Sequence, residues 1–120
     1  MLFSESLKKT RDFQRVYKTG RSYANRLLVM YIKENRTEGN RFGISVSKKV
    51  GNSVVRHHLA RLLRESYRLH EERFHSGWDI AVIARNSAKE ASYHQIESAL
   101  LHLGNLHGIL NKTEKKMNQN

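Results

Sequence analysis

The sequence predicts an α+β fold in which a single mixed β-sheet is packed with helices, in the order α-β-β(-β)-α-β-α. Three observations lead to this class. The chain has 120 residues, the length of one domain. Hydrophobic residues make up 38% of it, which suffices for a buried core. Segments with helical and with strand-like spacing follow one another along the chain. We therefore expect a single domain over residues 1–110 and a polar, disordered tail over residues 111–120.

The first helix is predicted from Thr10 to Tyr17. Phe13, Val16 and Tyr17 recur at i, i+3 and i+4, the apolar spacing of a helix. Thr10 is its expected N-cap, and Gly20 supplies a C-terminal stop.

Two strands are expected next. Residues 26–33 are rich in strand formers, with apolar side chains on both faces. Residues 41–47 alternate, so that Phe42, Ile44 and Val46 share one face while the other holds only glycine and serine. That second face is either solvated or open to a group that approaches the backbone closely.

A long helix is predicted from a cap at Asn52 or Ser53 to about Phe74. At 100° per residue, two opposite faces emerge. The apolar face carries Val55, Leu59, Leu62, Leu63, Ser66 and Leu69. The other face is a basic ridge that carries Arg56, His57, Ala60, Arg61, Arg64 and Arg68.

The last two elements have clear boundaries. Residues 78–84 form a short apolar run typical of a strand buried on both faces. Ser92 and Gln95 form a capping-box pattern at the start of the final helix. The apolar stripe of that helix is Ile96, Ala99, Leu100, Leu103, Leu106 and Leu110.

The charge balance calls for a polyanionic partner. Lys and Arg number 22 against 11 Asp and Glu, a formal charge of +11. A membrane surface is the weaker choice, because the apolar face of the long helix is needed to cover the sheet. Nucleic acid is therefore the expected partner.

The sequence offers little for catalysis by the chain itself. Asp12 and Asp79 are its only aspartates, and cysteine is absent. A metal-dependent nuclease needs several converging carboxylates, so we predict no catalytic residue and no bound metal or other cofactor in this chain. Asp79, inside a buried strand, is expected to have a structural role. From the pattern alone, Phe13, Tyr17 and Tyr31 are better explained as core residues than as platforms for bases.

The chain resembles the protein subunits of bacterial ribonuclease P. The resemblance rests above all on the block S-V-S-K-K-V-G-N from Ser45 to Asn52, followed by the arginine helix. It extends over residues 12–20, 24–26 and 79–85, and so covers nearly the whole chain. It implies a fold like the second domain of ribosomal protein S5, with a left-handed crossover around the arginine helix.

The resemblance also implies a function. Family members bind a catalytic RNA that, with Mg²⁺, removes the 5′ leader of precursor tRNA. The partners expected are therefore ribonuclease P RNA, in a 1:1 complex, and precursor tRNA, in the cytoplasm and without a membrane. The residues implied for RNA binding are Lys48, Lys49, Asn52, Arg56, His57, Arg61, Arg64 and Arg68. A cleft for the single-stranded leader would contain Phe13, Tyr17 and Tyr31, which reverses the core interpretation. A generic ribosomal or RNA-chaperone protein is the alternative.

One departure from the family pattern concerns the arginine helix. His57, His58 and Ala60 stand where the family has Asn, Arg and Lys. We expect His57 to act as a donor or stacking group, which would make RNA affinity sensitive to pH.

Overall fold

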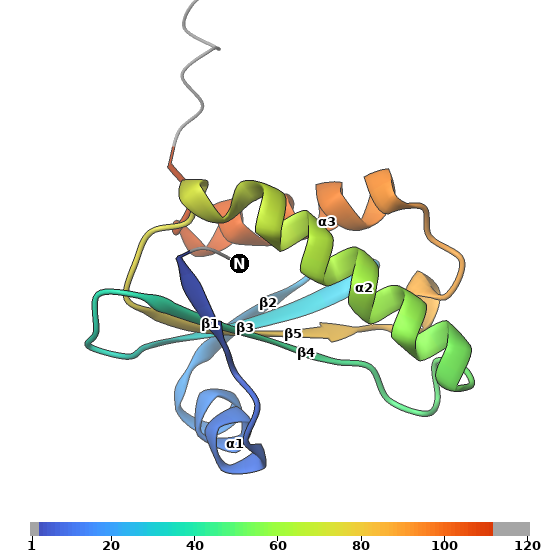
Figure 1. The fold of residues 1–120 in the computed structure, drawn as a ribbon, viewed down its shortest axis with the longest axis horizontal. Coiled ribbons are helices and arrows are strands. Elements are labelled where there is room, and N and C mark those ends of the chain that lie inside the picture. The colour runs from blue at the N-terminus through green and yellow to red at the C-terminus, as the bar shows by residue number, and fades with distance from the viewer. Residues whose placement is uncertain (1–2, 112–120) are drawn as a thin grey trace, which may run out of the picture.

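The computed structural model describes residues 3–111 and contains one five-stranded sheet. The strands are β1 (Ser4–Ser6), β2 (Arg21–Ala24), β3 (Leu28–Glu34), β4 (Asn40–Ser45) and β5 (Trp78–Ala84). The helices are α1 (Thr10–Thr19), α2 (Ser53–His70) and α3 (Tyr93–His107), with short 3-10 turns η1 (Glu71–Arg73) and η2 (Asn86–Ala88). Figure 1 shows α2 and α3 together on one face of the sheet and α1 alone on the other.

The sheet is mixed, as predicted. Its strand order is β1-β4-β5-β3-β2. β4 runs parallel to β1 and β5, whereas β3 runs antiparallel to β5 and β2. Because β4 and β5 are parallel neighbours, the chain between them must cross over the sheet, and α2 forms that crossover. β1 lacks a sequence signal, since its three residues are Ser-Glu-Ser. All but one residue of the predicted tail lie outside the described residues.

Each face of the sheet has its own core. Toward α2 and α3, the strands bury Leu28, Met30, Ile32, Phe42, Ile80 and Val82. Phe42 stacks on Tyr67 of α2 with ring centroids 4.0 Å apart. Toward α1, a smaller cluster joins Leu7, Val16 and Ala81. The sequence-predicted faces of β3 and β4 are thus confirmed.

The predicted apolar face of α2 needs two corrections. Leu69 is 55% exposed, whereas Tyr67, absent from the prediction, is fully buried. The buried face is rotated toward β1 and β4, because the Tyr67 hydroxyl bonds with Ser4 Oγ at 2.8 Å and its ring stacks on Phe42. The α-helix also ends at His70 rather than near Phe74, and a 3-10 turn follows.

Two further predictions about helix ends and stripes also need correction. Thr10 is the first residue of α1 rather than its cap, and the capping position, Lys9, makes no side-chain bond. Gly20 does end α1, with an extended backbone, and only glycine fits there because a Cβ would lie 2.3 Å from the carbonyl oxygen of Ile32. In α3 the capping box at Ser92 is present, but Leu106 is 43% exposed.

His107, rather than Leu106, completes the buried stripe of α3. Its Nε2–H donates to the Met30 carbonyl oxygen at 2.8 Å, which ties α3 to β3. Within the described part of the chain, its Nδ1 is buried and has no hydrogen-bond partner. Burial lowers the pKa of His107, and the nearby positive charge of Arg21 lowers it further. The hydrogen bond to Met30 raises this pKa but does not cancel the other two effects. The folded protein therefore holds this imidazole neutral.

We expect this histidine to make the fold sensitive to mild acid. Below its ordinary pKa near 6.5 the unfolded chain takes up a proton that the folded chain resists, so the free energy of unfolding falls as pH falls. The slope from this residue is at most about 1.4 kcal/mol per pH unit. Urea unfolding between pH 5 and pH 8 measures it, with His107→Gln as the comparison. An equal pH dependence in both proteins would contradict the expectation.

Candidate RNA interface

The exposed side of α2 is set by what the helix buries and by how it starts. Leu59 and Leu63 are fully buried against the sheet. Asn52 caps the helix, its side-chain oxygen accepting from Val55 N at 3.0 Å. Of the two caps that the sequence allows, the structure therefore has Asn52. The predicted basic ridge lies opposite, and we call its exposed residues Arg61 and Arg64 the α2 cationic face. His57, one turn before Arg61, is exposed as well.

Two arginines of the predicted ridge are already engaged by the protein. Arg68 donates through Nε and Nη2 to the two carboxylate oxygens of Glu65. This hydrogen bonding from Arg68 lowers the pKa of Glu65. Arg56 is half-buried and its Nε donates to the Gly51 carbonyl at 3.2 Å. Arg61 and Arg64, in contrast, form no ion pair with any residue in the range 3–111.

The loop before α2 adds two exposed cations. Lys48 and Lys49 lie between Ser45, the last residue of β4, and the cap of α2. In Figure 1 this loop leaves the end of β4 and leads to α2, which covers the opposite face of the sheet from α1.

The three predicted aromatic residues form a cluster on the α1 side of the sheet. The ring centroids of Phe13 and Tyr17 are 6.0 Å apart, and Tyr17 meets Tyr31 edge-on at 5.0 Å. All three side chains are half-buried, so part of each ring stays accessible. Burial raises the pKa of the Tyr17 hydroxyl, which is therefore neutral and able to donate.

The bare face of β4 proves to be a place of close approach. A Cβ at Gly43 would lie 2.5 Å from Phe13 Cζ and 2.7 Å from the Leu7 carbonyl oxygen. The groups that approach the β4 backbone here belong to this chain itself: Phe13 of α1 and Leu7 in the segment before α1. Glycine is therefore required for Phe13 to reach the sheet.

A four-residue ion network fastens α1 to the same face. Arg41 donates to both carboxylate oxygens of Asp79, from Nε at 2.9 Å and from Nη2 at 2.6 Å. Its Nη1 lies 3.2 Å from Asp12 Oδ2, and Arg15 of α1 approaches both aspartates. Burial alone would raise the pKa of Asp79, but the bonds from Arg41 and Asn35 and the charge of Arg15 lower it. The predicted structural role of Asp79 is confirmed.

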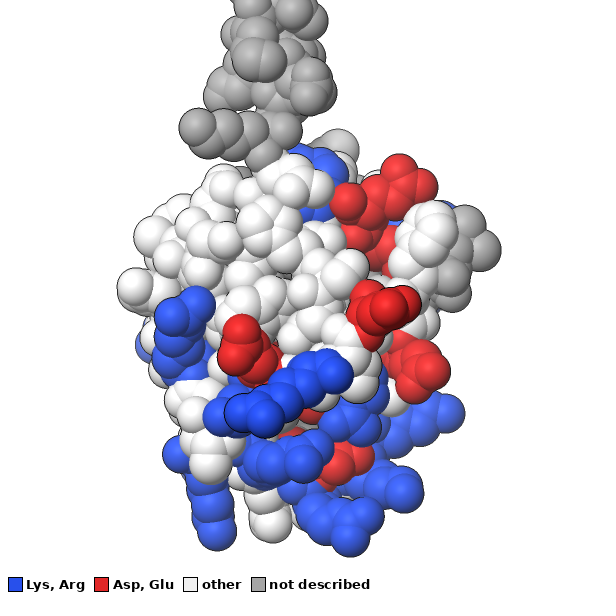
Figure 2. All heavy atoms as spheres, turned by 90° about the vertical axis from the view of Figure 1, so that its left-hand side faces the viewer, with Lys and Arg blue, Asp and Glu red and all other residues white. Residues whose placement is uncertain are grey.

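The outer side of α1 is also cationic. Arg11, Arg15 and Lys18 are exposed and recur at i, i+4 and i+7. Figure 2 shows Lys and Arg gathered in the lower half of the molecule, where α1 lies, with acidic residues set among them. These cations are not among the residues that the sequence predicts for the interface, although their spacing is a signal that the charge pattern contains.

The described residues contain neither a cluster of metal ligands nor a membrane-spanning helix. No group of three or more His, Cys, Asp or Glu within residues 3–111 is arranged to hold a metal ion. None of the helices in that range is long and apolar enough to cross a membrane.

The fold and these surfaces define a small, basic α+β protein with a cationic helix face and an aromatic cluster on opposite sides of one sheet. The sequence model of the Ribonuclease P family matches residues 1–106. The ribonuclease P protein component of Lachnoclostridium phytofermentans is 54% identical over 115 residues, covering 96% of this chain and 99% of that protein. The chain therefore belongs to the ribonuclease P protein family.

Solved structures agree with this assignment. The ribonuclease P protein of Staphylococcus aureus superimposes with a TM-score of 0.82 at 41% identity, covering 91% of this chain and 98% of that one. The Thermotoga maritima protein gives 0.78 at 30% identity, with coverages of 84% and 96%. The chain is thus a protein subunit of ribonuclease P, the tRNA 5′-maturation endonuclease. This assignment is favoured over the alternative of a generic ribosomal or RNA-chaperone protein.

Proposed function

We propose that this subunit contributes RNA binding and that the catalytic centre lies in the RNA partner. The observation that carries the proposal is the α2 cationic face. Arg61 and Arg64 are exposed on a helix whose other side is buried, and they pair with no carboxylate among the described residues. Solvated helix faces usually alternate charges to gain ion pairs, whereas unpaired cations neutralise phosphates and release counterions. We assign the RNA partner to this face, with Lys48 and Lys49 extending it.

The aspartates support the same division of labour. Asp12 and Asp79, the only two in the chain, are both held by arginines in the ion network. A metal-dependent nuclease site holds its ions with several converging carboxylates, and these two carboxylates are already occupied by arginines. We therefore propose that the Mg²⁺ of the reaction is bound by the RNA.

We further propose that the aromatic cluster binds the single-stranded 5′ leader of precursor tRNA. Phe13, Tyr17 and Tyr31 present partly accessible rings on one sheet face, and unpaired bases stack on such rings. The loop with Lys48 and Lys49 leads from the end of β4, a strand of this sheet, to α2 on the other face. A substrate leader and the RNA subunit can thus contact the protein at the same time.

Replacing Tyr17 by alanine is expected to weaken binding of precursor tRNA to the holoenzyme about 10-fold, the scale of one lost base–aromatic contact. The affinity for tRNA without a leader should not change, because the mature tRNA does not reach the cluster. Equilibrium binding of both RNAs to the reconstituted holoenzyme measures the difference. An equal loss for the two RNAs would contradict leader binding at this cluster.

Cleavage of precursor tRNA tests the proposed function as a whole. It is measured with the protein alone, with the RNA subunit alone and with both, across a range of Mg²⁺ concentrations. We expect no cleavage by the protein alone, and the largest enhancement by the protein at low Mg²⁺, where its cations replace ionic screening. Cleavage by the protein alone would overturn the assignment of the chemistry to the RNA.

The remaining expectations concern stoichiometry and place. We propose one protein per RNA, because each chain offers a single α2 cationic face. We propose a cytoplasmic location, which the absence of cysteine fits.

A further inference from the structure

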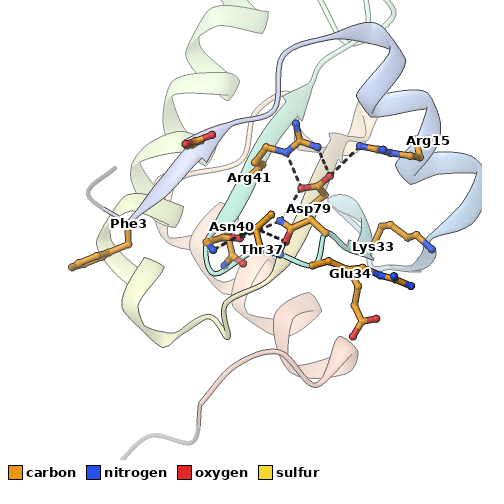
Figure 3. A pocket seen from close by; sticks show the side chains of 12 residues that line it. Phe3, Arg15, Lys33, Glu34, Thr37, Asn40, Arg41 and Asp79 are labelled. Atoms are coloured by element: carbon orange, nitrogen blue, oxygen red, sulfur yellow. Dashed lines mark hydrogen bonds and ion pairs between the residues drawn. The ribbon is translucent and has the colours of Figure 1, made fainter.

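A polar pocket on the far side of α1 from the aromatic cluster has no part in the function proposed above. It lies between β1, the loop after β3 and Arg15 of α1, and has a volume of about 600 Å³. That volume is in the range of sites for small organic ligands. Figure 3 shows the side chains that line it, among them Phe3, Lys33, Arg41 and Asp79. We call it the β3–β4 pocket.

The sheet register explains why α1 separates the two sites. Lys33, Asp79 and Arg41 are aligned in one row across β3, β5 and β4. The next row on the same face is Tyr31, Ala81 and Gly43, and it is this row that Val16, Tyr17 and Phe13 cover. Rows on one face are about 7 Å apart along the strands. The pocket therefore begins one row beyond the helix, on the side away from the leader cluster.

The cations of this pocket have donors to spare. Three N–H groups of Arg41 donate to Asp79 and Asp12, and a guanidinium has five, so two remain. The Arg41 side chain is 28% exposed. Arg15 is only loosely held, since its Nη2 lies 3.5 Å from Asp12 and 4.0 Å from Asp79. Both arginines could therefore contact an anion without leaving their carboxylates unpaired.

Lys33 and Arg36 add charge at the rim. Neither forms an ion pair with another residue in the range 3–111. Arg36 has φ of 59°, a left-handed conformation that costs free energy in a residue with a Cβ and that often marks a functional position. Of the acidic lining residues, Glu34 points away from the Arg41–Asp79 pair in Figure 3, whereas Glu5 of β1 lies in the same row of the sheet as Arg41. The four cations among the lining residues outnumber the three acids, Glu5, Glu34 and Asp79.

Phe3 supplies an aromatic surface at the opposite rim of the pocket, on the β1 side. Its side chain is 59% exposed, and its backbone N–H donates to Glu71 Oε2 at 3.0 Å, which fixes the residue in place. In Figure 3 the ring lies across the pocket from Lys33 and Arg15 and points away from the Arg41–Asp79 pair. A ring at one side of the pocket and cations at the other match the two parts of a nucleotide, a base that stacks and a phosphate that needs positive charge.

We propose that the β3–β4 pocket binds a leader nucleotide upstream of those held by the aromatic cluster. This inference rests on the proposed function, because it requires that the leader lie on the α1 side of the sheet. To pass from one site to the other, the strand must cross α1, which is roughly 10 Å wide. The face that it would cross carries Arg11, Arg15 and Lys18, all exposed. The cations of α1 are thus explained as a path between two stacking sites.

A series of precursor tRNAs with leaders lengthened one nucleotide at a time tests the proposal. Binding to the reconstituted holoenzyme should tighten in two steps as the leader grows. Phe3→Ala should weaken binding about 10-fold, the scale of one base–aromatic stack, but only for leaders long enough to give the second step. Arg36→Gly should weaken the same step severalfold without straining the loop, since glycine accepts positive φ. Tyr17→Ala should instead remove the first step.

The controls separate this proposal from the one on which it rests. Lys89→Ala removes an exposed cation from the turn after β5 and should leave the second step intact. If the first step is present and depends on Tyr17 but no second step follows, the pocket does not bind the leader and only this inference fails. If the Phe3 and Arg36 variants lose equal affinity at every leader length, including none, the effect is general and the pocket assignment is wrong. No tightening with any leader would overturn both proposals.

Discussion

Replacing Arg61 and Arg64 together by alanine is expected to weaken assembly with ribonuclease P RNA about 100-fold, or about 1.4 kcal/mol for each residue. Both side chains are exposed on α2, opposite its buried face, and neither forms an ion pair with a carboxylate in the described part of the chain. Each is therefore free to contact a phosphate. The fold should be unaffected, because the buried side of α2 is unchanged.

The salt dependence gives a second measure of the same change. If each arginine neutralises one phosphate, the log–log slope of affinity against salt should fall by about 1.4 to 1.8 in the double variant. Binding of the RNA subunit over a series of salt concentrations yields both the affinity and the slope. A loss of affinity with an unchanged slope would mean that these residues do not act through phosphate contacts.

Arg68→Ala is the matched control. Arg68 lies on the same helix, but Glu65 already engages its guanidinium through two hydrogen bonds. Its removal should therefore reduce RNA affinity much less than Arg64→Ala does. Glu65→Ala should do the opposite and strengthen binding, because it frees Arg68. If Arg64→Ala and Arg68→Ala had equal effects, the ion pairing within the free protein would not determine which cations contact the RNA.

The elements that the sequence predicts well are those with a local signal. The buried strand 78–84 and the capping box at Ser92 appear as expected, since continuous apolar runs and caps act over a few residues. β1 has no such signal: three polar residues become a strand only because β4 offers them a parallel edge. The prediction that Leu69 rather than Tyr67 is buried is wrong for a similar reason: the residues that contact Tyr67 belong to β1 and β4, which are distant in the sequence.

For the candidate sites, too, the sequence predicts local features but not contacts between distant segments. Residue type and spacing place Arg61, Arg64 and Arg68 on one helix face, but only the structure shows that Glu65 engages Arg68. The aromatic cluster is indicated by resemblance to the family, and the geometry brings its members together. The β3–β4 pocket has no sequence signature, since its cations come from α1, β3, a loop and β4 and meet only through the sheet register.

The second large effect is expected at Asp79, which should be the most sensitive polar residue of the fold. Asp79→Ala should lower the free energy of unfolding by about 3 kcal/mol, because it leaves the partly buried Arg41 without its main partner. The side chain of Asp79 is 1% exposed and accepts two bonds from Arg41 and one from Asn35. Urea or thermal unfolding measures the loss. Glu65→Ala, which breaks an exposed acid–arginine pair, is the comparison and should change stability far less.

Measuring the free energy of unfolding at low pH separates the contribution of the Asp79 charge from that of its side-chain volume. The hydrogen bonds and charges around Asp79 hold its pKa below the ordinary value of 3.8, so its contribution is present above that pH and is lost as pH falls through the lowered value. Asp79→Asn keeps the volume but has no such titration, so the two proteins should converge in stability at low pH. Asp79 holds Arg41, which in turn pairs with Asp12 of α1. Both variants should therefore also weaken leader binding while leaving the α2 cationic face and RNA assembly intact. A variant that loses stability but binds long and short leaders as the wild type does would show that α1 is held in place by Phe13 and Val16 alone.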